Sequence, residues 1–278
     1  MAVSAATPVK KIPMKHSLPP EFTDQAIRVA VAGCGGNGSQ VLTGLARMHL
    51  ALQALGHHGF QVCAFDPDRV TEANVGRQLF SPSDVGQYKA QVLINRLNLY
   101  YGLDWTATPN LYKAGERFSD QRADVLIGCV DSAAARRDLA KTKYKYWLDL
   151  GNTDKKGQVI LGTRTRSKKQ PIPIPLIRVL GRKESRAQLA RRQQYHLPPR
   201  PKLVTEIFPA LLDKRIVEDN TPSCSLAESL ESQDLFINQT VATFALQLLW
   251  QFIRQGGLDI HGYFINLESG RVTPLPIK

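Results

Sequence analysis

The sequence predicts an α/β fold of the Rossmann-like class, with a mostly parallel sheet and helices on both faces. Short apolar runs typical of buried strands alternate with longer amphipathic segments along the chain. A glycine cluster, Gly33-Cys-Gly-Gly-Asn-Gly38, directly follows the first of these runs and precedes the first helical segment. Right-handed crossovers then place the carboxyl ends of the strands, and a ligand crevice, along one edge of the sheet.

The first half of the chain alternates strands and helices. An apolar run predicts a strand at 28–32, which the glycine cluster ends, and apolar periodicity predicts a helix over 39–55. Asp66-Pro-Asp68 ends a second buried strand at 61–65. Leu93, Leu97 and Tyr100 lie on one side of a predicted helix over 86–99. Short strands are expected at 106–108 and 125–129, followed by a helix over 133–143.

The second half contains strands at 146–150 and 158–162, a helix over 235–254 and a terminal hairpin of 262–266 and 271–273. Between them lies a basic segment, since 164–202 has twelve Lys or Arg residues against one acid and the whole chain has a net charge of +12. Two proline-rich runs there cannot continue a helix or a central strand. We therefore expect a long basic excursion at 163–222, with a short helix near 184–194, inside one domain over 25–278 that follows an N-terminal extension, 1–24.

Composition limits the class of protein. With 278 residues, 43% of them hydrophobic, the chain can bury a large core without disulfides. Its most apolar stretch, 243–253, is shorter than the ~20 residues of a membrane span, and the first residues lack the pattern of a secretion signal. Its four cysteines, which form no C-x-x-C pair, argue against a disulfide framework or a zinc site. They are Cys34, Cys63, Cys129 and Cys224. We expect a cytoplasmic protein that does not enter membranes.

The glycine cluster predicts a nucleotide site. Glycines at the start of a helix let the backbone approach a phosphate and leave N–H groups free to bind it. Asp66, at the end of the second strand, could accept hydrogen bonds from the ribose of a dinucleotide or of ATP. Asn74, Arg77, Lys89 and Asp131 follow, which supply cations for phosphates and a carboxylate for Mg²⁺. A hydride-transfer enzyme does not need that set, so ATP is favoured over NAD.

Four motifs carry a resemblance to a known family. The patterns GxGGxGS, DxDxVxxxNxxRQ, VGxxK and CxD occur in this order over 28–150. They resemble those of the ThiF/MoeB/E1 superfamily, adenylating enzymes that activate ubiquitin-like and sulfur-carrier proteins. The segment 221–239 is further similar to the ThiF family of the bacterial PRTRC system. That gene cluster also encodes a small ubiquitin-like protein and an E2-like protein, so both become expected partners.

The resemblance implies that a carrier protein's C-terminal carboxylate attacks the α-phosphorus of ATP, giving an acyl-adenylate and pyrophosphate. ATP and Mg²⁺ are the implied cofactors. Asp66 would hold the ribose, Asn74 would contact phosphates, Arg77 and Lys89 would stabilise their charge, and Asp131 would bind Mg²⁺. The other implied cofactor-binding residues are Gly33, Gly35, Gly36, Asn37, Gly38, Ser39, Asp68 and Gln78, the last acting at one remove from the nucleotide. The superfamily usually dimerises, so a homodimer is expected.

Two questions stay open. Cys224 follows Pro222-Ser223 where the crossover would return, so it is either the acceptor of the activated acyl group as a thioester or an inert thiol. The basic segment is either a solvated loop or a docking surface for an acidic partner. A nucleic-acid-binding accessory protein with a vestigial nucleotide fold is therefore the alternative function.

Overall fold

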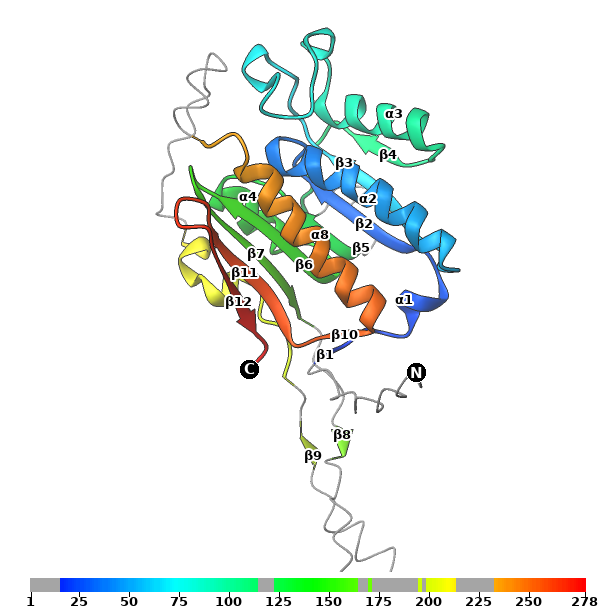
Figure 1. Ribbon diagram of the computed structural model, residues 1–278, viewed down its shortest axis with the longest axis vertical. Helices are drawn as coiled ribbons and strands as arrows, with labels where there is room; N and C mark the ends of the chain where they lie inside the picture. Colours follow the sequence, from blue (N-terminus) through cyan, green and yellow to red (C-terminus); the bar gives the residue numbers. More distant parts are fainter. Residues whose placement is uncertain (1–15, 115–122, 165–169, 172–194, 197–198, 214–232) are drawn as a thin grey trace, which may run out of the picture.

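The computed structural model describes residues 16–114, 123–164, 170–171, 195–196, 199–213 and 233–278 (Figure 1). Its main sheet has eight strands in the order β12-β11-β7-β6-β5-β2-β3-β4. In chain order these are β2 (Ile27–Ala32), β3 (Phe60–Phe65), β4 (Thr106–Thr108), β5 (Ala123–Gly128), β6 (Tyr144–Asn152), β7 (Lys156–Thr163), β11 (Ile260–Asn266) and β12 (Arg271–Pro276). The helices are α1 (Glu21–Asp24), α2 (Gly36–Ala54), α3 (Lys89–Tyr101), α4 (Ala133–Leu139), α6 (Val204–Ile207) and α8 (Ile237–Gln255).

The sheet has a parallel half and an antiparallel half. Strands β6, β5, β2, β3 and β4 run parallel, while β7, β11 and β12 pair antiparallel with their neighbours. Val29 of β2 lies between Val62 of β3 and Val125 of β5, at the centre of the parallel half. The carboxyl ends of β2, β3 and β5 therefore meet at one edge of the sheet. The predicted α/β class and mostly parallel sheet are confirmed.

Helices cover both faces of the sheet, because the side chains of β2 alternate between the two faces and are apolar on each. Val29 and Val31 face the core under α2, α3 and α8, whereas Ala30 and Ala32 face the core shared with α4 and α6. Figure 1 shows α2 and α8 side by side in front of the sheet. They approach closely at Gly44, where a Cβ would lie 2.1 Å from Leu246 Cδ1.

Two predicted helices are shorter than expected or begin later. The helix predicted from residue 86 begins at Lys89, because Gly86 has φ +86° and its N–H group bonds to Val70 in a turn. The helix predicted to reach residue 143 ends at Leu139, where Thr142 Oγ1 donates to the Leu139 carbonyl and the chain turns into β6. Conversely, α2 begins three residues early, at Gly36, inside the glycine cluster. The helix predicted at 184–194 lies outside the described residues.

Residues 16–24, part of the segment called the N-terminal extension, pack on the domain. The strand β1 (His16–Ser17) pairs with β10 (Gly257–Leu258), and Phe22 of α1 is 1% exposed in the main core. A second small sheet joins β8 (Gln170–Pro171) to β9 (Tyr195–His196). Three short 3-10 turns complete the described elements: η1 (Glu72–Asn74), η2 (Pro82–Asp84) and η3 (Pro209–Leu212).

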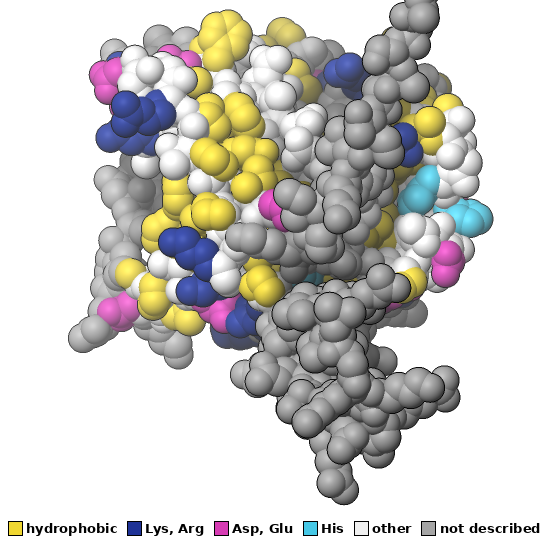
Figure 2. All heavy atoms as spheres, turned by 60° about the horizontal axis from the view of Figure 1, so that its bottom comes forward, with side chains coloured by type: hydrophobic (Ala, Val, Ile, Leu, Met, Phe, Trp, Pro, Cys, Tyr) yellow, Lys and Arg dark blue, Asp and Glu magenta, His cyan; other side chains and the backbone are white. Residues whose placement is uncertain are grey.

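The face of the molecule drawn in Figure 2 mixes charged with apolar side chains. Figure 2 shows Lys and Arg side chains in small separate groups among hydrophobic ones, with acidic groups between them. Of the residues in the basic segment, Arg200 pairs with Glu206, and the guanidinium of Arg164 lies 4.8 Å from the centre of the Tyr144 ring. Within the described residues, no helix combines the length and the apolarity that crossing a bilayer requires.

Candidate functional site

A cavity of about 1120 Å³ lies at the carboxyl ends of β2, β3 and β5 and continues over β7, β11 and β12. A cavity at this edge is expected of an open parallel sheet. Most of the predicted site residues line it together. They are Gly33, Gly35, Gly36, Asn37, Asp66, Asp68, Arg77, Gln78, Lys89 and Asp131.

The glycine cluster brings backbone to the cavity. Gly33 has φ +93°, and a Cβ there would lie 2.6 Å from the Cys129 carbonyl oxygen, so only glycine fits between β2 and the end of β5. At Gly36 a Cβ would lie 2.5 Å from Asn238 Cγ. No side chain caps the N-terminus of α2. Its positive end, with N–H groups that have no helical partner, therefore faces the cavity and favours an anion.

Three predicted site residues lie behind the residues that line the cavity and support them. Gly38 lies against Gly33, where a Cβ would be 2.0 Å from the carbonyl oxygen. Ser39 Oγ donates to the Gly36 carbonyl over 3.2 Å and accepts the Leu79 N–H group over 3.3 Å. Asn74 Oδ1 accepts the Thr71 N–H group over 3.0 Å and so caps its own turn. None of Gly38, Ser39 and Asn74 is among the residues that line the described cavity.

Asp66 ties the end of β3 to the glycine cluster. Its Oδ2 accepts the Cys34 N–H group over 2.6 Å, and its Oδ1 accepts the Asp68 N–H group over 2.8 Å. Burial raises the pKa of the Asp66 carboxyl, while these hydrogen bonds and the charge of Lys89 oppose that rise. Each oxygen keeps a further lone pair, so the carboxylate can still accept a hydroxyl from a ligand.

Lys89 and Arg77 both line the cavity, but different residues hold their side chains in place. Lys89 is the first residue of α3, and its Nζ atom lies 3.0 Å from Asp68 Oδ2. The Lys89 side chain is 10% exposed, whereas that of Asp68 is 64% exposed. Arg77 Nη1 donates to Gln233 Oε1, a neutral acceptor. Burial lowers the pKa of Arg77, and its Nε atom is buried without a hydrogen-bond partner in the described residues.

Gln233 and Asn238 support Arg77 from the start of α8. Asn238 Nδ2 donates to the same Gln233 Oε1 over 3.1 Å, so one carbonyl oxygen joins α8 to Arg77. Both residues also line the cavity. Sequence reasoning assigned them no role, although both lie in the segment that carried the finer resemblance.

Asp131 is exposed in the cavity and is fixed through its backbone. Arg136 Nη1 donates to the Asp131 carbonyl over 3.1 Å, Nη2 donates to the Leu150 carbonyl over 3.1 Å, and Nε donates to Asp149 Oδ1 over 3.1 Å. Burial raises the pKa of Asp149, and the charge of Arg136 opposes it. Sequence analysis missed Arg136; the only signal was an arginine in the helix after Asp131 and an acid inside an apolar strand.

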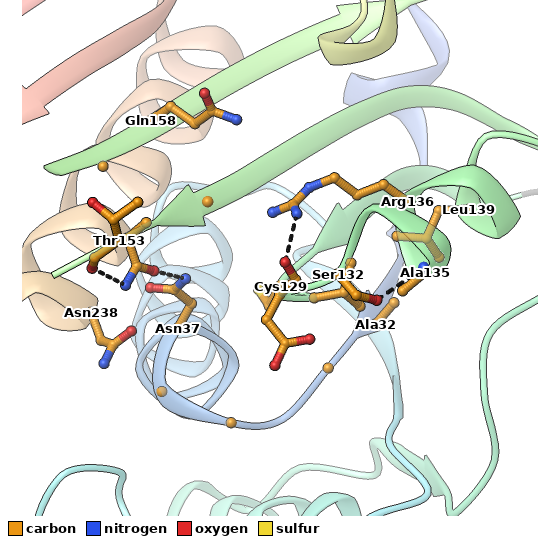
Figure 3. Close-up of a pocket in the computed structure, with 18 of the residues that line it drawn as sticks. Ala32, Asn37, Cys129, Ser132, Ala135, Arg136, Leu139, Thr153, Gln158 and Asn238 are labelled. Carbon is orange, nitrogen blue, oxygen red and sulfur yellow. Dashed lines mark hydrogen bonds between the residues drawn. The ribbon is translucent and has the colours of Figure 1, made fainter. Parts of the chain in front are cut away.

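A chain of amides links α2 to the end of β6. Asn37 Nδ2 donates to Asn152 Oδ1 over 2.7 Å, and Asn152 Nδ2 donates to the Thr153 carbonyl over 3.2 Å (Figure 3). Asn37 Oδ1 is buried and has no hydrogen-bond partner in the described residues. Asn152 was likewise not predicted, since nothing in its local sequence distinguishes it.

The antiparallel half adds a second lobe to the cavity. Strand register places Asn266 between Lys156 and Arg271, and the next cavity-facing row contains Gln158, Phe264 and Thr273. The rings of Phe264 and Phe208 meet edge to face, with centroids 6.2 Å apart. The cavity is thus polar and glycine-rich at the parallel half and partly apolar and basic at the antiparallel half.

The described cysteines are free thiols, and two of them are poor nucleophiles. Burial raises the pKa of Cys34 and of Cys129, which keeps both protonated at neutral pH. Cys63 lies within β3. Cys224, the predicted acyl acceptor, lies outside the described residues.

Comparison with known proteins places the chain in a family. The model of the ThiF family matches residues 25–271. The chain belongs to the ThiF family. Among solved structures, this ThiF-family chain is similar to Escherichia coli MccB, with a TM-score of 0.52, 13% identity and coverage of 92% of this chain and 63% of MccB. No match is found among curated proteins.

MccB is also similar to this ThiF-family chain in crystals with ligands. With ATP, the TM-score is 0.51, with 14% identity and coverage of 92% of this chain and 65% of MccB. With selenomethionine-labelled MccA, the TM-score is 0.51, with 13% identity over the same shares of 92% and 65%. At this identity the likeness shows the ThiF/E1 adenylation fold, and this chain spans less than two thirds of the length of MccB.

Proposed function

We propose that this protein uses ATP to adenylate the C-terminal carboxylate of a small ubiquitin-like carrier protein. The observation that carries the proposal is a single cavity whose lining includes the cations Arg77 and Lys89, the exposed carboxylate of Asp131 and the uncapped N-terminus of α2. Membership of the ThiF family and the similar fold of MccB, which has been crystallised with ATP and with MccA, support it.

The chemistry needs position and charge more than proton transfer. The carrier carboxylate attacks the α-phosphorus, a new P–O bond forms, and the bond from the α-phosphorus to the bridging oxygen of the β-phosphate breaks, releasing pyrophosphate. The nucleophile is already an anion, so no general base is required. Arg77, Lys89 and the N-terminus of α2 offset the charge of the phosphates, and Asp66 holds the ribose.

The donor set around Asp131 fits Mg²⁺. Mg²⁺ is usually held by one or two carboxylates, with substrate phosphates and water completing its shell. Among the described residues, no group of three or more His, Cys, Asp or Glu side chains forms a metal site of its own. Asp131 would therefore hold the ion directly or through water, and Mg²⁺ would neutralise phosphate charge. Arg136 keeps the Asp131 backbone in place for this role.

The proposal predicts that Arg77→Ala and Asp131→Ala abolish ATP–pyrophosphate exchange while the fold is kept. Both side chains contact ligand rather than core in this scheme, so thermal unfolding should change by only a few degrees. Exchange is measured with and without a co-encoded small protein that ends in an exposed glycine. Arg47→Ala and Asp104→Ala, which remove exposed charges elsewhere, serve as matched controls. Near-normal exchange in both site variants would contradict the assignment.

We further propose Cys224 as acceptor of the acyl group. Attack of its thiolate on the acyl-adenylate forms a thioester and releases AMP. The raised pKa values of Cys34 and Cys129 support the choice, because a protonated thiol is a poor nucleophile. A carrier adduct should survive denaturant, disappear with reductant and be lost in Cys224→Ala. An adduct that persists in Cys224→Ala would rule out this acceptor.

The partners follow from the same reading. The similarity of 221–239 to the PRTRC family supports a ubiquitin-like carrier and an E2-like protein from that gene cluster, and we expect a homodimer in the bacterial cytoplasm. The alternative function, nucleic-acid binding, rests on the basic segment 164–202, most of which lies outside the described residues. Steeply salt-dependent DNA binding that is lost when this segment is neutralised would favour it.

A further inference from the structure

Asn37 presents a hydrogen-bond acceptor at the N-terminus of α2, where the backbone N–H groups around it are donors. It is the second residue of α2, lines the cavity and is 8% exposed. Its Nδ2 is engaged by Asn152 Oδ1, whose own orientation is set because Asn152 Nδ2 donates to the Thr153 carbonyl. The chain of amides therefore leaves Asn37 Oδ1 as the free atom (Figure 3), and that oxygen has no partner in the described residues.

A buried carbonyl oxygen without a donor destabilises the protein unless a ligand or a bound water molecule supplies one. Phosphate oxygens cannot satisfy Asn37 Oδ1, because they too are acceptors and are repelled by it. An acceptor at the N-terminus of a helix, where free N–H groups favour anions, therefore indicates a second kind of ligand group. That group must carry an N–H or O–H donor.

The position of Asn37 in the cavity decides whether the nucleotide or the carrier supplies the donor. Asp66, the residue suited to ribose hydroxyls, ends β3, whereas Asn37 is held by the end of β6. In the sheet order β6-β5-β2-β3, three strand spacings separate those ends, or about 14 Å. Ribose hydroxyls held by Asp66 would therefore lie on the far side of the cavity. The attacking group must instead enter over β6 and β7, where the cavity continues into its second lobe.

We propose that Asn37 Oδ1 accepts the last peptide N–H group of the carrier's C-terminal tail. This rests on the proposed adenylation. In a peptide, that N–H group is separated from the attacking carboxylate by a single Cα atom, so one hydrogen bond would orient the nucleophile. Asn37 is then a specificity-determining residue: it selects a carboxylate that ends a peptide and rejects tails that end in proline or an N-methylated residue.

The test changes one atom of the carrier. A ubiquitin-like carrier that supports exchange is prepared by semisynthesis with its last residue joined either by the normal amide or by an ester, which replaces N–H with oxygen. Wild-type enzyme should lose about tenfold in kcat/KM for the ester carrier, as expected for one unmade buried hydrogen bond. In Asn37→Leu the two carriers should react within twofold of each other.

A second variant tests the orientation of Asn37 without touching the tail. Asn152→Leu removes the acceptor that engages Asn37 Nδ2, so the Asn37 amide can turn and discrimination should fall below threefold. Gln239→Leu, an exposed residue of α8, should discriminate as the wild type does.

The outcomes separate this inference from the proposed function. Equal reaction of wild-type enzyme with both carriers, or discrimination that survives in Asn37→Leu, overturns the inference and leaves adenylation intact. A raised requirement for ATP or Mg²⁺ in Asn37→Leu overturns it as well, because Asn37 then serves the nucleotide. Absence of exchange with the amide carrier in wild-type enzyme overturns the proposed function, and this inference with it.

Discussion

Arg77 and Lys89 carry the same charge in opposite settings. Lys89 is paired with the carboxylate of Asp68, so part of its charge is already compensated. Arg77 is held by the neutral oxygen of Gln233, and its full charge remains available to a ligand. Gln233 thus positions Arg77 without neutralising it, a role that an acidic residue could not perform.

We predict that Gln233→Leu raises the KM for ATP by about tenfold and changes kcat less. The substitution leaves Arg77 Nη1 without its acceptor, and a lost hydrogen bond to a charged group costs about 1.5–3 kcal/mol. Adenosine, which has no phosphates, should bind as before, because Gln233 acts through a cation that contacts phosphates. Titration calorimetry with both ligands checks this. An equal loss of adenosine binding would indicate a general structural defect instead.

The residues of the site differ in how far the sequence reveals them. Asp66, Arg77, Lys89 and Asp131 lie in local motifs, so their residue types and the resemblance of those motifs to the family's indicate them. Asn152 and Gln233 act through partners distant in the chain, and Arg136 bonds to residues on the neighbouring strand β6. Asn152 contacts a residue 115 positions away, and Gln233 contacts one 156 positions away. No periodicity or motif encodes such contacts, because they depend on the assembled sheet.

At the scale of elements, every predicted strand and helix that falls on described residues exists, and only the bounds differ. Apolar periodicity detects the buried middle of an element. Its ends depend on turns and caps, such as the positive φ of Gly86 and the hydroxyl of Thr142. Strands β6 and β7 are also longer than predicted, because added residues such as Lys145, Asn152 and Lys156 are polar and lie outside the apolar runs.

The N-terminal turn of α2 makes a prediction about stability. In Gly38→Ala the new Cβ would lie 2.0 Å from the Gly33 carbonyl oxygen, a backbone atom that cannot turn away. In Gly44→Ala the nearest atom is the end of the Leu246 side chain, at 2.1 Å, which can adopt another rotamer. We expect Gly38→Ala to lower the free energy of unfolding by about 3 kcal/mol or more and Gly44→Ala by about 1 kcal/mol or less, since alanine favours the helix.

Urea unfolding of the two variants measures this difference. Gly44→Ala is the matched control because it makes the same substitution in the same helix. Equal losses of stability would show that close contact with the Gly33 backbone does not fix the start of α2.

At the scale of the molecule, one buried histidine, His16, connects the N-terminal strand to the sheet, and a second, His261, lies within the sheet. His16 Nε2 lies 2.9 Å from the Tyr146 hydroxyl, and His261 Nδ1 lies 3.0 Å from the Leu161 carbonyl oxygen. Burial, with a smaller contribution from His261, lowers the pKa of His16 from 6.5 to about 4. Burial also lowers the pKa of His261, and the positive charge of Lys202 lowers that pKa further.

These pKa values predict that the fold loses stability in mild acid. A histidine with a lowered pKa in the folded protein binds protons more readily when unfolded, so its contribution is present above about pH 6.5 and is lost as the pH falls towards 4. Each pH unit in this window costs up to about 1.4 kcal/mol per histidine. Thermal unfolding between pH 7.5 and 4.5 should show the decline, and His16→Gln should flatten it.

The exposed His58 provides the control, since His58→Gln should leave the pH dependence unchanged. A decline of the same slope in His16→Gln would mean that other groups cause it.

The outer edge of the antiparallel half has a consequence for how the protein behaves at high concentration. The edge strand β12 contains Pro274 and Pro276, and proline has no N–H group to offer an incoming strand. The opposite edge, β4, is only three residues long. Neither border is a good template for cross-β stacking, so crowded molecules should resist growth into fibrils through this sheet.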